Sequence, residues 1–472
     1  MRVINKLDRS YDKNLILVFE GETEYCNFIS EEGKKLIDGL ILKNKFTGKK
    51  GECLEVNFYQ NDYLISMDIL GFGKKEEFEN NLFREVLFKY FSKKNGSILI
   101  SAKSPELNNV NIICEILGNV NYSFDEFKSE KSNKLEVDFF TPEEKDITEE
   151  LNLNEAVDIT RELVNLPANI INPDTLAERV IELGAKYNFE VEILDENKIQ
   201  ELGMNLLYNV GKASINKPKL IIMRYLGDPN SDYKIGLVGK GLTYDTGGLC
   251  LKPADSMLNM KDDMTGGATV IGSMCAIAKN KLKKNVIGVV PACENAINGN
   301  SYRPGDILRA MNGKTVEIIN TDAEGRLALA DAITYIVRNE KVNEITDLAT
   351  LTGAMMVALG TFITGVFSNN DKNYIKLEES CKKYGERIWR MPLDNDFKEL
   401  LKSEVADFKH MGTRWGGAIS AAKFLEIFAE GIPWTHMDIA GTAFDNSSKW
   451  FKKGASGIHV RGIYEYCKGN KE

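Results

Sequence analysis

The sequence predicts a two-domain α/β protein, with a small N-terminal α/β domain and a larger α/β domain whose mostly parallel central sheet is flanked by helices. Strand-like and helix-like segments alternate along nearly the whole chain. The length of 472 residues suits two or three domains, at roughly 150 residues each. A highly charged stretch at residues 125–154 divides the two regions. We therefore expect domains at residues 1–150 and 151–472.

In the first region, apolar runs at residues 15–19, 98–100 and 110–116 predict strands, and residues 77–90 predict a helix. The charged stretch contains Thr141-Pro142-Glu143-Glu144, and a threonine before a proline and acidic residues is typical of a helix start. It predicts a linker helix that begins there, at the end of the first domain, and runs into residues 155–164.

In the second region, chemistry-bearing residues follow two predicted strands. A strand at 235–238 leads into a glycine-rich stretch and then a helix at 265–278. A strand at 316–319 leads through residues 320–326 into a helix at 327–332. These two turns carry the candidate residues Lys240, Asp245, Lys252, Asp263, Asp322, Glu324 and Arg326. Ligands in open α/β sheets collect at such strand-to-helix turns.

A capping box and a phosphate loop are the alternative interpretations of these turns. Thr321 and Glu324 fit a capping box, which satisfies N–H groups at a helix start, but this leaves Asp322 and Arg326 without a role. A nucleotide-phosphate loop is disfavoured because Lys240 is followed by glycine rather than serine or threonine. The first glycine of such a loop is also missing, since Lys234 stands in its place.

The carboxylates favour divalent ions held mainly by oxygen. The chain has only three histidines, and its eight cysteines form no Cys-x-x-Cys pair, which argues against a histidine-rich zinc site and a zinc ribbon. Burying four carboxylates together without cations would be very unfavourable, and two divalent ions would neutralise them. His410 and His436 are interpreted as structural, and His459 is assigned no role.

Together these segments resemble the leucyl aminopeptidase family, the M17 cytosol aminopeptidases. The resemblance covers roughly residues 155–465 and includes the spacing of the candidate residues. Further matching motifs are Leu163-Val164-Asn165-Leu166-Pro167, Pro291-Ala292-Cys293-Glu294-Asn295, Arg303-Pro304-Gly305-Asp306, Ala349-Thr350-Leu351-Thr352-Gly353-Ala354, His436-Met437-Asp438-Ile439-Ala440-Gly441 and Gly454-Ala455-Ser456-Gly457. Residues 1–150 show no motif that we can match.

The resemblance implies the role of each site residue. One metal would be held by Lys240, Asp245, Asp263 and Glu324, and the other by Asp245, Asp322 and Glu324. A water between the ions would be the nucleophile. Lys252 would stabilise the oxyanion, and Arg326 would hold a bicarbonate acting as general base. The substrate would be lined by Met260, Thr350, Leu351 and Gly353, although Met260 is equally well explained as a core methionine.

The sequence thus predicts a metal-dependent aminopeptidase that removes N-terminal residues from peptides, preferably apolar and leucine-like ones. Manganese or zinc is favoured, with magnesium or cobalt as alternatives, and the family resemblance implies a homohexamer. The alternative from another class is a catalytically silent homologue acting as a scaffold or DNA-binding regulator. A two-metal phosphoesterase is a third interpretation, because two-metal sites serve that chemistry as well.

The composition and net charge of the chain indicate which classes of partner and which cellular compartment to expect. The net charge of −9 argues against a general affinity for nucleic acid. No apolar run approaches the roughly 20 residues of a membrane span, and the N-terminus carries no secretory pattern. Scattered cysteines without a disulfide framework favour a reducing compartment. We therefore expect a cytoplasmic location, with no membrane contact.

Overall fold

The computed structural model describes residues 1–23, 29–60, 62–445 and 449–469. The described residues form two compact units, one within the ranges 1–154 and 449–452 and the other within the ranges 155–448 and 453–472. The short segment Lys449–Lys452 therefore packs with the first unit, which the sequence did not predict. Within the described ranges, no helix is both long enough and apolar enough to cross a membrane.

The first unit is built on one sheet. Among its described residues the strand order is β1-β6-β5-β2-β4-β3, with β3–β4 as the antiparallel pair and the other pairs parallel. The strands are β1 (Arg2–Ile4), β2 (Lys13–Val18), β3 (Cys53–Gln60), β4 (Tyr63–Gly71), β5 (Ser97–Ser101) and β6 (Glu136–Phe140), and the α-helices are α1 (Glu31–Asn44), α2 (Asn80–Phe91) and α3 (Val110–Asn121).

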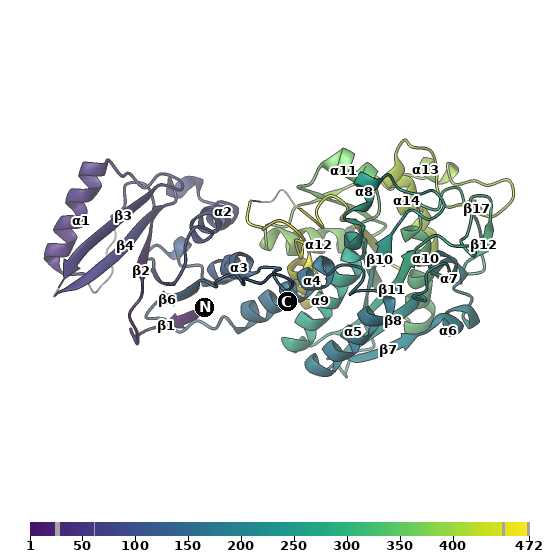
Figure 1. Cartoon of the computed structure of the whole chain (residues 1–472), viewed down its shortest axis with the longest axis horizontal. Helices are drawn as coiled ribbons and strands as arrows, with labels where there is room; N and C mark the ends of the chain where they lie inside the picture. Colours follow the sequence, from purple (N-terminus) through teal and green to yellow (C-terminus); the bar gives the residue numbers. More distant parts are fainter. Residues whose placement is uncertain (24–28, 61, 446–448, 470–472) are drawn as a thin grey trace. The chain divides into compact units, whose positions relative to one another are not determined.

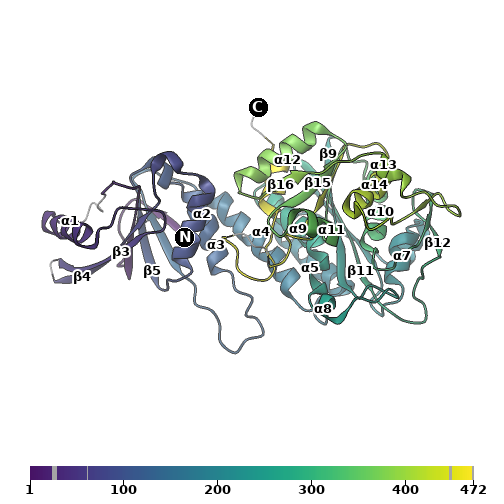
Figure 2. The ribbon, with the colours of Figure 1, turned by 90° about the horizontal axis from the view of Figure 1, so that it is seen from above.

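Alternate residues of β2 enter two different apolar cores, as the period of two in a strand requires. Leu15 and Leu17 belong to the core that contains residues of α2 and α3, whereas Ile16 belongs to a core with Ile37 of α1. Figures 1 and 2 both show α1 beside β3 and β4. Helices therefore cover both faces of this sheet, and the strands predicted at 15–19 and 98–100 are confirmed as β2 and β5.

One predicted element of the first region is wrong, and the predicted start of another is too early. Residues 110–116, expected to be a strand, begin α3, because Asn109 caps a helix by accepting from Ile112 N at 3.2 Å. A continuous apolar run does not by itself distinguish a buried strand from a buried helix. The helix expected to begin at Thr141 starts later, as α4 (Thr148–Asn165). Thr141 N instead donates to Ile4 O at 3.0 Å, continuing the strand pairing.

The second unit contains a larger, mostly parallel sheet, in which nine strands lie within the described residues. Their order is β16-β15-β18-β14-β9-β11-β8-β7, with β10 paired to β11. These strands are β7 (Glu190–Leu194), β8 (Lys219–Leu226), β9 (Lys234–Gly239), β10 (Gly241–Asp245), β11 (Asn285–Asn295), β14 (Glu344–Ala349), β15 (Thr364–Ser368), β16 (Ile388–Arg390) and β18 (Trp434–Asp438). A small separate sheet contains β12 (Ile307–Arg309), β13 (Thr315–Glu317) and β17 (Phe408–Lys409).

Helices flank this larger sheet. Figure 1 shows β8 and β11 between α5 and α9 on one side and α7 and α10 on the other. The α-helices are α5 (Pro173–Tyr187), α6 (Glu196–Glu201), α7 (Asn205–Gly211), α8 (Ala254–Met257), α9 (Thr265–Lys279), α10 (Gly325–Tyr335), α11 (Gly353–Leu359), α12 (Asp371–Lys383), α13 (Asp396–Glu399), α14 (Gly417–Glu426) and α15 (Val460–Lys468). The expected α/β class with a mostly parallel, helix-flanked sheet is confirmed.

Candidate active site

The candidate site lies at the carboxyl ends of the central strands. Asp245 ends β10, Asn295 ends β11 and Asp438 ends β18, while Lys240 and Thr350 directly follow β9 and β14. Because most of these strands are parallel, residues far apart in the sequence meet at one edge of the sheet. The glycine-rich turn and the acidic turn meet at this edge, where Lys240 contacts Glu324 and Lys252 contacts Asp322.

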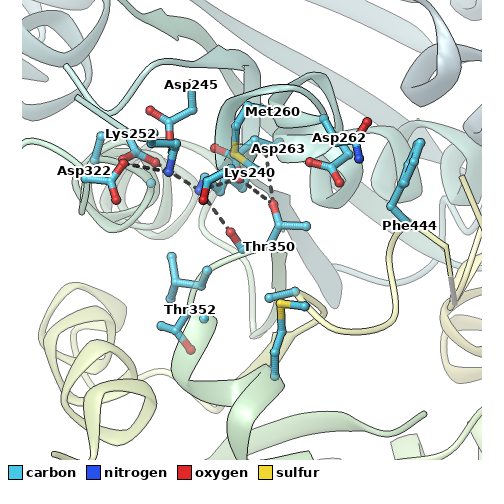
Figure 3. A pocket seen from close by; sticks show the side chains of 18 of the residues that line it. Lys240, Asp245, Lys252, Met260, Asp262, Asp263, Asp322, Thr350, Thr352 and Phe444 are labelled. Atoms are coloured by element: carbon cyan, nitrogen blue, oxygen red, sulfur yellow. Dashed lines mark hydrogen bonds and ion pairs between the residues drawn. The ribbon is translucent and has the colours of Figure 1, made fainter. Parts of the chain in front are cut away.

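Lys240 is the centre of one buried cluster. Its Nζ lies 2.7 Å from Asp263 Oδ1 and 3.1 Å from Glu324 Oε1. It also donates to the carbonyl of Thr350 at 3.1 Å, and Thr350 Oγ1 donates to Asp263 Oδ1 at 2.8 Å (Figure 3). Gly325 leaves room for this lysine, since a Cβ there would overlap the Lys240 side chain. A side chain at residue 325 would therefore displace Lys240 from its present position beside the carboxylates.

Lys252 joins a second pair of carboxylates. Its Nζ lies 2.8 Å from Asp245 Oδ2 and 2.6 Å from Asp322 Oδ1 (Figure 3). The other oxygen of Asp245 accepts from Asn295 Nδ2 and from Gly247 N, both at 2.8 Å. Asp245 is thus fixed from two sides, and the two lysines together contact all four candidate carboxylates.

Thr321 holds the two turns together, and the capping-box interpretation is wrong. Its Oγ1 donates to Gly247 O at 2.7 Å and accepts from Cys250 N at 2.8 Å. Helix α10 begins at Gly325, with no side-chain cap from Glu324. Gly247 has a φ of 86°, a conformation that favours glycine. Thr321 therefore positions the turn that leads to Lys252.

Burial and the charged neighbours have opposite effects on the pKa values of the cluster. Desolvation raises the pKa of Asp263 well above its usual value and raises the pKa of Asp245 to about 6. For Glu324 the effect of burial is outweighed by Lys240 and Lys252, so its pKa is lowered. Burial alone would lower the pKa of Lys240, but the neighbouring carboxylates raise it overall. Cations bound among these carboxylates would offset the cost of burying their charged forms.

The donor set fits divalent ions. Asp245, Asp322 and Glu324 can each offer an oxygen, and these atoms all lie within 4.8 Å of one another. Asp263 Oδ2 and Glu324 Oε2 are buried and have no hydrogen-bond partner among the described residues. Burying carboxylate oxygens without hydrogen-bond partners is unfavourable. Hard divalent ions prefer oxygen ligands such as carboxylates, so a bound ion would supply the missing partner. The residues present could therefore hold the two ions that the sequence predicts.

Arg326 and His410 form a supporting arrangement beside the carboxylates. Arg326 Nη1 donates to His410 O at 2.9 Å, whereas its Nε is buried and has no partner among the described residues. Desolvation lowers the pKa of Arg326 to about 10. The ring of His410 accepts from Ile319 N at 3.2 Å and lies 2.9 Å from Asn320 O. His410 thus fixes the turn before Asp322, a role that residue type alone does not reveal.

A cavity of about 580 Å³ opens over these groups. It is lined by all seven candidate metal and catalytic residues and by the four predicted substrate residues, Met260, Thr350, Leu351 and Gly353. The sequence did not single out several further lining residues: Asp255, Asp262, Met356, Phe444 and Asp445. Asp262 directly precedes the predicted metal ligand Asp263 in the sequence. A charged residue next to a predicted ligand was a signal that could have identified Asp262 as a residue of the site.

The other histidines lie in hydrogen-bonded networks. His436 Nδ1 lies 2.6 Å from Asp347 Oδ1, and neither residue lines the cavity. His459 forms a second group with Cys381 and Glu386 whose potential ligand atoms lie close together. Its Nε2 already lies 2.7 Å from Thr364 Oγ1, and Glu386 accepts from the backbone N–H of His459 at 3.0 Å. That group is therefore a satisfied buried network.

Comparisons with known proteins agree with this geometry. Residues 158–464 match the cytosol aminopeptidase family catalytic domain, and residues 16–131 match the N-terminal domain of the same family. The chain is 47% identical to a probable cytosol aminopeptidase of Fusobacterium nucleatum, with 99% of each chain covered. It is 43% identical to a probable cytosol aminopeptidase of Clostridium perfringens, with 96% of each covered.

A solved structure is similar to this chain over nearly its whole length. The bottromycin maturation enzyme BotP, in complex with Mn, superposes with a TM-score of 0.85 at 29% identity, over 97% of this chain and 99% of that one. The match spans both units, so the N-terminal region without recognisable motifs is also a family domain. The chain therefore belongs to the cytosol aminopeptidase family, M17, a family of metal-dependent aminopeptidases.

Proposed function

We propose that this protein is a two-metal aminopeptidase that removes N-terminal residues from peptides, with a preference for apolar, leucine-like ones. The observation that carries the proposal is the set of four carboxylates and two lysines that line the cavity, with buried carboxylate oxygens that lack partners among the described residues. When bound, two divalent ions would activate water and polarise the scissile carbonyl. Manganese or zinc is favoured, and the manganese in BotP supports that choice.

The carboxylates divide into shared and separate ligands. As the family resemblance implies, Asp245 and Glu324 would help to hold both ions; both side chains are buried and offer oxygens near Asp322. Asp263 with Lys240 would complete one ion's ligands, and Asp322 the other's. Lys240 can ligate only as a neutral amine, whereas the surrounding carboxylates raise its pKa. Added positive charge from the ions would have to reverse that preference.

The two remaining basic residues act on the substrate side. Lys252 keeps its charge beside Asp245 and Asp322, and it would stabilise the negative charge that develops on the carbonyl oxygen. Arg326 would hold a bicarbonate that serves as general base. Its Nε has no partner among the described residues and its guanidinium lines the cavity, which suits a planar anion.

The substrate would enter the cavity with its free amine toward the ions. Met260 offers an apolar wall for the first side chain, and the same cavity is lined by Thr350 and Leu351, which precede α11, and by Gly353, which begins it. We further propose a cytoplasmic homohexamer. The names of its relatives, probable cytosol aminopeptidases, support the location.

Hydrolysis assays test this proposal. The purified protein is incubated with Leu-p-nitroanilide and with a phosphodiester, each with and without Mn²⁺. Metal-dependent release of nitroaniline alone supports the aminopeptidase. Cleavage of the phosphodiester alone would favour a phosphoesterase, and inertness toward both with metal bound would favour a silent homologue.

A further inference from the structure

One carboxylate of the cavity is not used by the proposed mechanism. Asp262 lines the cavity from the short 3-10 helix η3 (Met260–Met264), between Met260 and Asp263. Among the described residues its carboxylate makes no ion pair, and its only hydrogen bond is to its own backbone. The neighbouring Asp263, in contrast, contacts both Lys240 and Thr350.

The other acidic residues of the cavity are accounted for. The four candidate metal ligands contact lysines, and Asp445 Oδ1 accepts from Gly454 N at 2.6 Å. Asp255 is exposed to solvent. Asp262 is partly buried, and a partly buried carboxylate without a partner is unfavourable. A cation delivered by the substrate would supply the missing partner.

The position of Asp262 suits a substrate side chain. In Figure 3, Asp262 and Phe444 lie on one side of Asp263, and Asp322 and Lys252 lie on the other. Met260 and Phe444 add apolar surface to the cavity that Asp262 lines. The side chains of lysine and arginine combine a methylene stem with a charged end, so their stem can cover apolar surface while the end meets a carboxylate. A leucine side chain can cover the apolar surface but has no charged end to pair with the carboxylate of Asp262.

We propose that Asp262 makes the cavity accept N-terminal lysine and arginine in addition to apolar residues, by pairing with the charged end of the substrate's first side chain. This inference rests on the proposed aminopeptidase function, and it names a further substrate class for the same cavity. Asp262 is thus a specificity-determining residue, with no part in the bond-breaking step.

The test compares two substrates that differ mainly in the charged end. Lysine- and norleucine-p-nitroanilide share the same methylene stem. Leu-p-nitroanilide serves as the reference substrate that reports the basal aminopeptidase activity at saturating Mn²⁺. We expect wild type to cleave the lysine substrate with a higher kcat/KM than the norleucine substrate. Asp262→Asn should lower kcat/KM for lysine by at least about 10-fold, the effect of losing a charged hydrogen bond, with little change for norleucine and leucine.

Asp255→Asn is the matched control, because it removes the same charge from an exposed position of the same cavity. It should change the lysine-to-norleucine ratio much less. An equal change of this ratio in both variants would indicate a general electrostatic effect of the cavity's negative charge and would overturn the role of Asp262. An unchanged ratio in Asp262→Asn would overturn it as well. Poor cleavage of lysine with good cleavage of leucine by wild type would overturn this inference alone, whereas failure on every substrate would also remove the proposed function.

Discussion

Lys240 Nζ and Asp263 Oδ1 lie 2.7 Å apart, and both side chains are buried. Lys252, the other lysine of the cavity, also pairs with two carboxylates but is more exposed, at 15% against 4% of the side chain. The two lysines are the same residue type, and they differ in how deeply their side chains are buried. Lys240 is enclosed among metal-ligand candidates, while the side chain of Lys252 is more accessible from the cavity.

The first prediction separates these lysines. Lys240→Ala should weaken metal affinity first, with activity partly recovered at high metal concentration. Lys252→Ala should keep both ions and lose kcat by about 10²- to 10³-fold, as expected for an oxyanion donor. Metal titration combined with steady-state kinetics on both variants measures this. If Lys252→Ala lost an ion and Lys240→Ala did not, the two roles would be reversed.

The second prediction concerns pH and His410. Desolvation and the nearby Arg326 lower the pKa of His410 from 6.5 to about 4 in the folded protein. The unfolded chain therefore binds this proton more readily, so stability is present above pH 6.5 and is lost as pH falls towards 4. The loss is about 3 kcal/mol, from roughly 1.4 kcal/mol for each pH unit.

The variant His410→Gln isolates this effect, because other groups titrate equally in both proteins. Thermal unfolding between pH 7 and pH 4 should show a steeper decline for wild type than for the variant. Parallel declines would show that His410 does not titrate as its buried position requires.

The third prediction concerns assembly. If this chain assembles as its family resemblance implies, light scattering should give a mass near six times 52.9 kDa. Dilution series with activity measured alongside provide the check. A monomer with full activity would exclude any contribution of assembly to the active site.

Much of the site could be predicted from the sequence because its residues cluster in two short turns. The predicted strand before Lys240 and the predicted helix after Asp263 end within a residue of their observed bounds, since β-branched and small residues leave little ambiguity there. Recognising these turns as a family signature supplied the roles, which spacing alone leaves open. The candidate residues then meet because parallel strands end at one edge.

What could not be predicted depends on contacts between distant segments. The Thr350 carbonyl on Lys240 and the Asn295 amide on Asp245 appear only when β14 and β11 are in place. The wrong strand at 110–116 reflects an apolar run that fits either element, decided by the Asn109 cap. The helix start predicted at Thr141 was wrong because the backbone of Thr141 pairs with Ile4, and this pairing outweighed the local pattern of threonine before proline and acidic residues.

The most direct test of the two-metal account is a titration of metal-stripped protein with Mn²⁺, following Leu-p-nitroanilide hydrolysis and bound metal together. Activity should rise to its maximum at about two ions per chain, as a two-metal mechanism requires. Glu324→Gln, which changes a candidate bridging carboxylate that is buried with one oxygen unpartnered among the described residues, should bind at least one ion fewer and lose activity. Full activity of Glu324→Gln, or of protein without bound metal, would contradict the account.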